Sequence, residues 1–147
     1  MARGAGSLRG ALARMRWRVR REPYALLSFP RRAGGAAAGA LARLPRGALA
    51  ELVLERAGAT LLLPESRLAA LRGRLGPARI RRGFRIISFE VPMEWTVVGF
   101  LARIAAALAE ARVPIGVVCS FEFDHLFVPA RRLPAARRAV ARALRLP

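Results

Sequence analysis

The sequence predicts an α+β protein built from ferredoxin-like βαββαβ modules, in which antiparallel sheets carry their helices on one face. The first observation is that residues 84–129 follow a clear strand, helix, strand and strand pattern. The second is that residues 24–75 repeat this order with weaker signals, which suggests a duplicated module. Because so few helices cannot cover both faces of a small sheet, we expect a second module to bury the other face.

The second half of the chain gives the clearest elements. Residues 84–91, FRIISFEV, are apolar on both faces and predict a strand that Pro92 ends. Over residues 97–111 apolar side chains recur at helical spacing, which predicts one helix with an apolar face. Residues 115–120 predict a central strand covered on both sides, with Cys119 in the core. The remaining elements expected here are a reversal at 121–123, a strand at 124–128 and a helix at 134–144.

The first half of the chain predicts the same order less clearly. The segment YALLSF is bounded by prolines and predicts a strand. Ala57-Gly58 separates two apolar runs and predicts a hairpin turn. Leucines at helical spacing follow Pro64 and predict a short helix. In order, we expect a strand at 24–29, a flexible or weakly helical connector at 33–42, strands at 49–56 and 60–63, and a helix at 65–74.

The N-terminal segment is expected to be a disordered basic extension. Residues 1–21 contain seven arginines and no acidic residue. An Arg-rich amphipathic leader is also typical of organelle transit peptides, and such a helix can lie on an anionic membrane surface. A start codon assigned too far upstream would give a similar segment. We therefore assign residues 1–22 to an extension, 23–80 to a degenerate N-terminal module and 83–147 to a C-terminal domain.

The net charge of +18 arises because every basic side chain except His125 is an arginine. Clustered cations bind phosphate backbones, so a basic RNA-associated protein that uses the arginines of 1–21 and 131–145 is one alternative. A GC-rich coding sequence explains the same charge, because the chain has no Lys, Asn or Gln. The arginines also do not alternate with aromatic residues, as they do on base-stacking surfaces. Nucleic acid is therefore the less favoured partner.

Several other classes fit the sequence poorly. No apolar run approaches the roughly 20 residues that span a bilayer, so we expect no membrane span and a cytoplasmic location. A single Cys and a single His exclude a disulfide framework and a Cys/His zinc site. Nothing beside Cys119 would activate it as a nucleophile with His125. We expect no cofactor and no enzyme activity, since paired carboxylates, a phosphate loop and a Ser/His/Asp set are all missing.

The second half resembles the ACT domain, a small-molecule-binding regulatory module. The motifs that carry this resemblance are VVGFLARI at 97–104, ALAEA at 107–111, VPI at 113–115 and SFEFDHLFV at 120–128. It extends over roughly residues 83–145 and is most specific around Gly99 and Asp124. The sequence is most similar to the ACT group of eukaryotic arginine sensors and aspartate kinase regulatory regions. Over residues 24–75 the resemblance rests only on the order of elements and the hairpin.

The resemblance implies a ligand site where the loop before the first long helix meets the turn after residue 119. A helix that starts at Gly99 has free backbone N–H groups suited to a carboxylate. Asp124 can hold an ammonium group, and Trp95, Phe100 and Phe121 can form the walls of a side-chain pocket. The ligand-binding residues expected on this basis are Trp95, Thr96, Val98, Gly99, Phe100, Ser120, Phe121, Glu122 and Asp124.

The expected function is therefore regulation by a bound small molecule, an amino acid, at an interface of ACT modules within a chain or across a homodimer. The loop Pro92-Met93-Glu94-Trp95-Thr96 and Gly116 depart from the family pattern, because related proteins often carry polar ligand-facing residues there. A module that only mediates assembly with a partner is thus a second possibility. His125 is expected to be a structural histidine that points away from Asp124.

Overall fold

The computed structural model describes residues 7–145, and the chain divides into two compact units. Unit 1 combines the N-terminal residues up to Arg21 with the residues from Arg85 onward. Unit 2 is Glu22–Phe84, so its sequence is inserted into that of unit 1. Strand β5, Arg79–Phe89, contributes its first half to unit 2 and its second half to unit 1.

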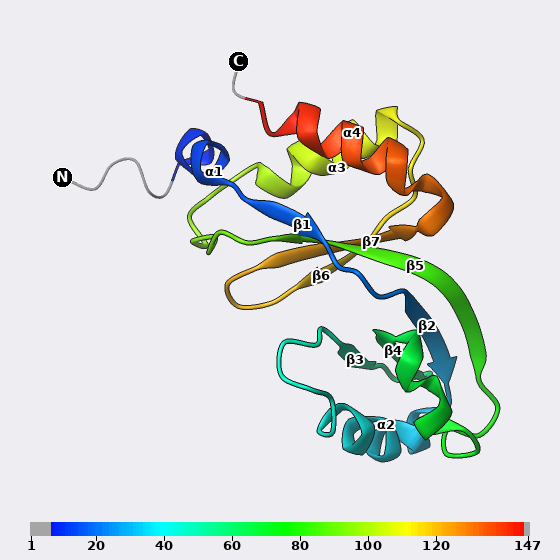
Figure 1. Cartoon of the computed structure of the whole chain (residues 1–147). Helices are drawn as coiled ribbons and strands as arrows, with labels where there is room; N and C mark the ends of the chain where they lie inside the picture. The colour runs from blue at the N-terminus through cyan, green and yellow to red at the C-terminus, as the bar shows by residue number, and fades with distance from the viewer. Residues whose placement is uncertain (1–6, 146–147) are drawn as a thin grey trace. The chain divides into compact units, whose positions relative to one another are not determined.

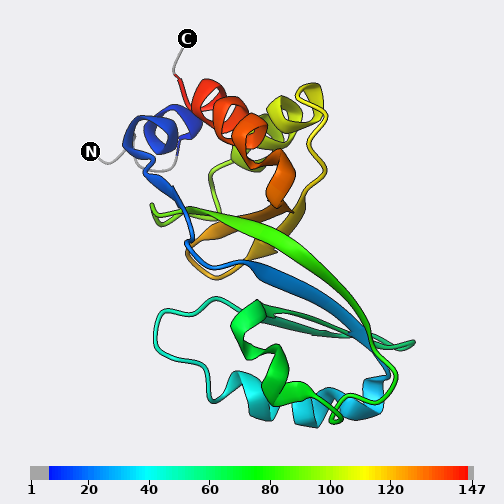
Figure 2. The ribbon, with the colours of Figure 1, turned by 45° about the vertical axis from the view of Figure 1, so that its right-hand side comes forward.

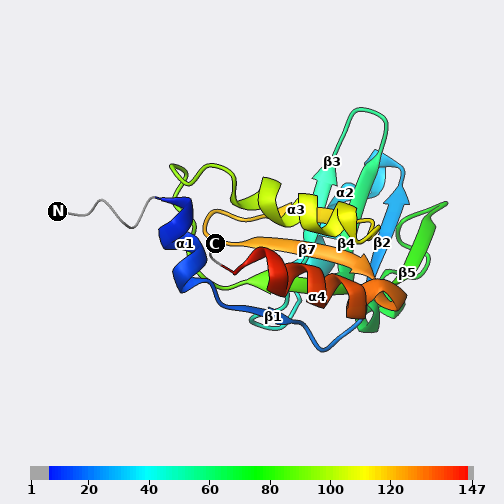
Figure 3. The same cartoon turned by 90° about the horizontal axis from the view of Figure 1, so that it is seen from above.

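Unit 1 is a four-stranded sheet with its helices on one face (Figure 1). The strand order is β1-β5-β7-β6, with β1 antiparallel to β5 and β6 antiparallel to β7. Figure 3 shows α1, α3 and α4 over this sheet when it is viewed from above. The elements are α1 (Leu8–Arg14), β1 (Trp17–Val19), α3 (Phe100–Glu110), β6 (Gly116–Cys119), β7 (Asp124–Pro129), η3 (Ala130–Arg132) and α4 (Leu133–Ala143).

The core of unit 1 lies between the sheet and these helices. Alternate residues of β5 and β7 face the helices, and the apolar faces of α3 and α4 cover them. Each fully buried Leu, Ile, Phe or Val contributes roughly 1.5–3 kcal/mol to the free energy of unfolding. The main side chains of this core are Ile87, Phe89, Phe100, Ile104, Leu108, Leu126, Val128, Ala136 and Val140.

Unit 2 has the same topology on a smaller scale. Its strand order is β3-β4-β2-β5, in which every pair is antiparallel. Figure 2 shows α2 and η2 next to each other below these strands, and the two helices are in contact. The elements are β2 (Tyr24–Phe29), η1 (Arg31–Ala33), α2 (Gly34–Leu41), β3 (Glu51–Leu54), β4 (Ala59–Pro64) and η2 (Glu65–Leu71).

The two units confirm the predicted ferredoxin-like class. Unit 2 runs strand, helix, strand, strand, 3-10 helix, strand, and its first strand β2 lies between its third and last strands. Unit 1 runs in the same order from β5 to α4, and its last strand position is filled by β1 from the start of the chain. The antiparallel sheet with helices on one face therefore occurs twice.

The prediction of a disordered extension over residues 1–22 is wrong for residues 7–21. Ser7 caps α1 through a hydrogen bond from the Gly10 amide, and Leu12 is buried in the core of unit 1. Trp17–Val19 then pair with the end of β5. Residues 1–6 of the predicted extension lie outside the described residues.

Other elements differ from the prediction in type or place. The connector expected at 33–42 is mostly the helix α2, and the helix expected at 65–74 is the shorter 3-10 helix η2. Strand β5 begins at Arg79 rather than at residue 84. Strand β6 lies at the edge of its sheet, so Cys119 is exposed and the expectation of a core cysteine is wrong.

Candidate functional site

A cavity of about 220 Å³ lies in unit 1, beside the loop that precedes α3 and the turn between β6 and β7. Two backbone hydrogen bonds shape it. The Met93 amide donates to the Glu122 carbonyl at 2.9 Å, which ties the loop to the turn. The Val97 amide donates to the Glu94 carbonyl, also at 2.9 Å, and closes a turn within the loop. The lining residues are Met93, Glu94, Trp95, Val97, Leu101, Cys119, Ser120, Phe121, Glu122 and Asp124.

Ser120 orders the β6–β7 turn. Its amide donates to the Phe123 carbonyl at 2.9 Å, and its hydroxyl oxygen lies 3.0 Å from both the amide nitrogen and the carbonyl oxygen of Phe123. Cys119 and Asp124 are register partners and therefore share one face of the hairpin. The turn thus brings Asp124 into the same cavity as the loop residues.

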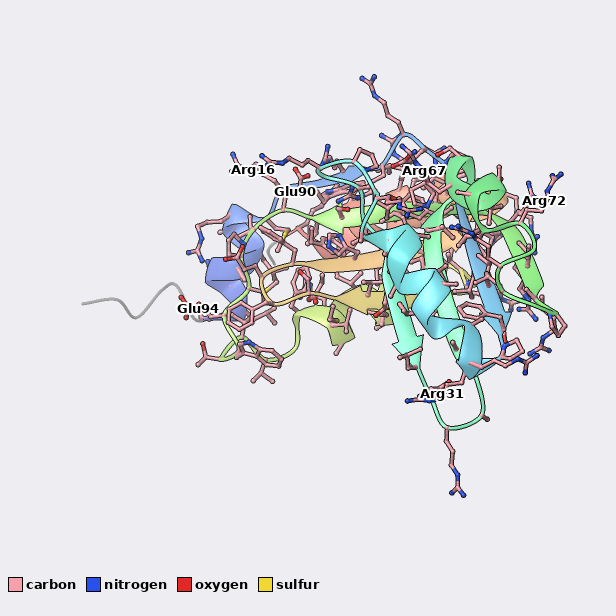
Figure 4. All side chains as sticks on the ribbon, turned by 90° about the horizontal axis from the view of Figure 1, so that it is seen from below. Arg16, Arg31, Arg67, Arg72, Glu90 and Glu94 are labelled. Carbon is pink, nitrogen blue, oxygen red and sulfur yellow. The ribbon has the colours of Figure 1, made fainter. Side chains whose placement is uncertain are left out.

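The charged residues that line the cavity are acidic, although the chain as a whole is strongly basic. Glu94, Glu122 and Asp124 line it, and none of the arginines does. Figure 4 labels Glu94, which extends from the loop before α3. The Thr96 hydroxyl donates to a carboxylate oxygen of Glu94 at 3.3 Å. This charge pattern suits an ammonium or guanidinium group and opposes a phosphate.

The other walls of the cavity are apolar and partly uncovered. Trp95 and Phe121 are 85% and 82% exposed, although both are large aromatic side chains. Val98, two residues before α3, is also 82% exposed. Exposed apolar residues close together mark an interaction surface more often than isolated ones do.

Five of the residues that we predicted for the ligand site line this cavity: Trp95, Ser120, Phe121, Glu122 and Asp124. Thr96 contacts a lining residue, whereas Val98, Gly99 and Phe100 do not line the cavity. Phe100 is buried in the core instead, where its ring meets that of Phe89 edge-on at a centroid distance of 5.1 Å.

Gly99 has a local role that the structure makes clear. It lies just before α3 with φ of 93°, a left-handed conformation that disfavours any side chain, and it fixes the start of the helix at Phe100. A Cβ placed on Gly99 would meet Leu8 Cδ2 of α1 at 3.6 Å. The neighbour of this glycine is therefore α1. The left-handed conformation of Gly99 explains why α3 starts later than predicted.

The ligand-binding residues expected from the sequence did not include five residues that line the cavity: Met93, Glu94, Val97, Leu101 and Cys119. The alternation of strand residues was the available signal for Cys119, because Asp124 pairs with it across a tight hairpin. Leu101 and Val97 were assigned to the buried face of the helix. No group of three or more His, Cys, Asp or Glu side chains within residues 7–145 is arranged to hold a metal ion.

His125 lies on the opposite face of β7 from Asp124, paired with Val118, so it cannot form a dyad with Cys119. Its Nδ1 is 2.9 Å from the Ser88 hydroxyl oxygen, which also accepts a hydrogen bond from Arg20 Nε at 3.1 Å. Burial lowers the pKa of His125, and the nearby charge of Arg20 lowers it further, while Asp124 and Glu90 act in the opposite direction. The imidazole is therefore neutral at physiological pH.

Comparison with known proteins shows what the second half of the chain is similar to. Residues 79–142 match the family model of the ACT domain, a range that includes β5, α3, β6, β7 and the cavity. The match confirms, for this part of the chain, the resemblance to the ACT domain found in the sequence. No curated protein matches the chain.

Solved structures resemble the chain over most of its length. A Vibrio cholerae protein of unknown function, described as a possible transport protein, aligns with a TM-score of 0.68 and 23% identity over 97% of this chain and 99% of that one. The ligand-free regulatory subunit of aspartate kinase from Thermus thermophilus aligns with a TM-score of 0.67 and 19% identity, covering 88% and 97%. A protein from Agobacterium tumefaciens aligns at 0.65 and 18%, covering 88% and 89%. At these identities the likeness shows a shared fold.

Proposed function

We propose that this protein is a non-enzymatic regulatory protein that binds a small molecule, an amino acid, in the cavity beside α3. The observation that carries the proposal is the set of three carboxylates, Glu94, Glu122 and Asp124, around an arginine-free cavity inside an ACT domain. In a chain with a net charge of +18, this is where a cationic group finds favourable partners.

The ligand would be recognised through its charge and through contacts with its apolar part. Asp124 is held at the start of β7, so its carboxylate is positioned for an ammonium group before the ligand arrives. Trp95 and Phe121 would lie against the apolar part of the ligand or the face of a cation. Ser120 is already bound to Phe123 and would shape the turn rather than contact the ligand.

We further propose that a second copy of the chain covers the exposed side of the cavity and makes a homodimer. The support is the exposure of Trp95, Val98 and Phe121, which leaves apolar area in water unless a partner buries it. A ligand bound there would favour one arrangement of the two copies, which is how it would signal to a regulated partner. The same patch favours a second candidate function, a ligand-free assembly module in the cytoplasm.

The test is a thermal-shift panel of the twenty amino acids on the full chain. A ligand that binds only the folded protein stabilises it by about 2.7 kcal/mol at one hundred times its Kd, so a true ligand raises the melting temperature. Asp124→Asn should lower the affinity for that ligand by about tenfold or more, because a charge-assisted hydrogen bond is lost. Sedimentation of the same samples measures whether the protein is a dimer.

Glu110→Gln is the matched control, since it removes the same charge from the exposed end of α3, where Glu110 pairs with Arg142 at 3.3 Å. This variant should keep the wild-type ligand shift. Loss of the shift in both variants would point to net charge rather than to the site. If no amino acid raises the melting temperature and the protein is a stable dimer, the assembly function is favoured. If no amino acid raises it and the protein is a monomer, both the ligand-binding function and the assembly function are contradicted.

A further inference from the structure

Unit 2 contains a larger cavity, of about 460 Å³, which no part of the proposed function uses. Pockets that bind small molecules usually have volumes of about 300–1,000 Å³. All of its lining residues belong to unit 2: Leu27, Glu65, Ser66, Leu68, Ala69, Leu71, Arg72, Gly73, Leu75, Gly76, Ala78, Ile80 and Arg82.

This cavity arises because a full second helix is missing from unit 2. In unit 1 the helix α4 covers the sheet, but the corresponding element in unit 2 is the 3-10 helix η2, which ends at Leu71. Gly73 and Gly76 then adopt left-handed φ angles of 73° and 69° and turn the chain. The sheet below is left partly uncovered.

The floor of the cavity is apolar and incompletely buried. Leu27 and Ile80 are register partners on neighbouring strands, so both face the cavity. Leu27 is 1% exposed, whereas Ile80 is 47% exposed. Leu71 and Leu75 also line the cavity, and each is 4% exposed. An apolar wall that stays open on the helix side of a sheet is suited to an apolar ligand.

The rim of the cavity is cationic. Arg72 and Arg82 line it, and the segment 67–82 holds six arginines and no acidic residue. Figure 4 labels Arg67 and Arg72, which extend from η2 and from the residue after it. The one acidic lining residue, Glu65, accepts a hydrogen bond from the Gly83 amide at 2.6 Å. No carboxylate within residues 7–145 forms an ion pair with Arg72 or Arg82.

We propose that this cavity is a second binding site, for a small anion with an apolar chain, in which Arg72 and Arg82 bind a carboxylate and the leucines and Ile80 hold the chain. Arginine binds carboxylates with two parallel hydrogen bonds, which fixes the head group. A nucleic acid fits less well, because no aromatic residue lines the cavity to stack on a base. The charge preference is opposite to that of the acidic cavity in unit 1.

Titration calorimetry on the full chain with octanoate tests this site. We expect saturable binding of octanoate, no binding of acetate, which lacks the chain, and no binding of octyltrimethylammonium, which reverses the charge. Arg82→Gln should lower the affinity for octanoate by about tenfold or more, because the hydrogen bond between the guanidinium and the carboxylate is lost. Arg46→Gln is the matched control, since it removes one charge from an exposed loop of the same unit. It should bind as the wild type does.

A second variant keeps the result interpretable if Arg82→Gln does not fold. Ala69 lines the cavity and is exposed, so Ala69→Phe should fill the space and abolish octanoate binding while the protein stays folded. Asp124→Asn should leave octanoate binding unchanged, which separates this site from the proposed amino-acid site. Equal binding to Arg82→Gln and Arg46→Gln, retained binding in Ala69→Phe, or binding of the alkyl cation would overturn the proposal.

Discussion

Ser88 and His125 are the buried polar side chains among residues 7–145. Since Arg20 Nε donates to the Ser88 hydroxyl oxygen, the hydroxyl proton is free to point at His125 Nδ1. The ring then keeps its own proton on Nε2. Protonation of Nδ1 would place a second cation beside Arg20 and would break this arrangement.

This network predicts a dependence of stability on pH. The pKa of His125 is lower in the folded protein than the 6.5 of an unperturbed histidine, so below pH 6.5 the unfolded chain binds a proton that the folded chain does not. The free energy of unfolding should therefore fall as pH decreases from 6.5, by up to about 1.4 kcal/mol per pH unit. Urea unfolding at pH 7.5, 6 and 5 measures this loss.

His125→Asn is the informative variant, because its side-chain oxygen can accept from Ser88 but cannot take up a proton in this range. The wild type should lose more stability than the variant between pH 6.5 and 5. Burial raises the pKa of Glu51, which acts in the opposite direction, but it is present in both proteins and cancels in the comparison. Parallel pH curves for the two proteins would show that His125 does not titrate as described.

The location of a single residue could be predicted where strand residues alternate in the sequence. It could not be predicted where tertiary packing decides which way a side chain faces. The strand pattern placed Phe121 and Asp124 at a tight reversal, the resemblance to the ACT domain assigned them to the ligand site, and both line the cavity. Phe100 begins a helix, and periodicity alone does not tell whether such a residue faces a ligand or the core. Cys119 was misplaced because an apolar strand of four residues looks the same at the edge of a sheet as at its centre.

At the scale of elements, two arginines act as caps for helix ends. Arg132, at the end of η3, donates to the carbonyl oxygens of Ala111 and Arg112 at 2.8 and 3.1 Å, just beyond the C-terminus of α3. Arg103 of α3 donates to the carbonyls of Ala143 and Arg145 at the end of α4. These carbonyls lack partners within their own helices, and a cation also favours the negative end of the helix dipole.

Removing one cap should destabilise unit 1. Arg132→Met keeps the aliphatic stem and loses both hydrogen bonds, so we expect a cost of roughly 1–2 kcal/mol in the free energy of unfolding. Arg138→Met in α4 changes the same charge at an exposed position and should cost less than about 0.5 kcal/mol. Chemical denaturation of the three proteins decides the point, and equal costs would refute the capping role.

The strands were easier to predict than the helices of unit 2. β2 has the predicted bounds, and Ala57-Gly58 does lie between the paired strands β3 and β4. α2 consists of Ala and Gly with one Leu and has little amphipathic character, so its helical form depends on packing against the core of unit 2. η2 shows leucines at helical spacing, but the left-handed glycines that follow it shorten the element.

At the scale of the whole molecule, the N-terminal segment could not be assigned from local patterns. β1 is a short strand with arginines on both sides, and its partners are Ile87, Ser88 and Phe89, far along the sequence. The strand pattern of the partner was visible in the sequence, but nothing local to a three-residue strand shows which distant segment it pairs with. Within residues 7–145 no helix has the length and apolar content needed to cross a membrane.

Leu12→Ala tests whether this segment belongs to the folded unit. Leu12 is 6% exposed and packs in the core of unit 1, so the substitution should cost about 2–5 kcal/mol in the free energy of unfolding. Arg9→Ala, at an exposed position of the same helix, should cost less than about 0.5 kcal/mol. Thermal or chemical unfolding measures both, and a disordered segment would give no difference between them.

The insertion of unit 2 into unit 1 has a consequence for how the chain can be altered. The chain leaves unit 1 after Arg21 and re-enters it at Arg85. At this junction the Arg85 guanidinium donates a hydrogen bond to the Arg20 carbonyl at 2.8 Å. The residues in between are therefore a cassette whose two ends already meet. The sequence of such an inserted segment can diverge, shorten or be replaced while the strands of unit 1 keep their pairing.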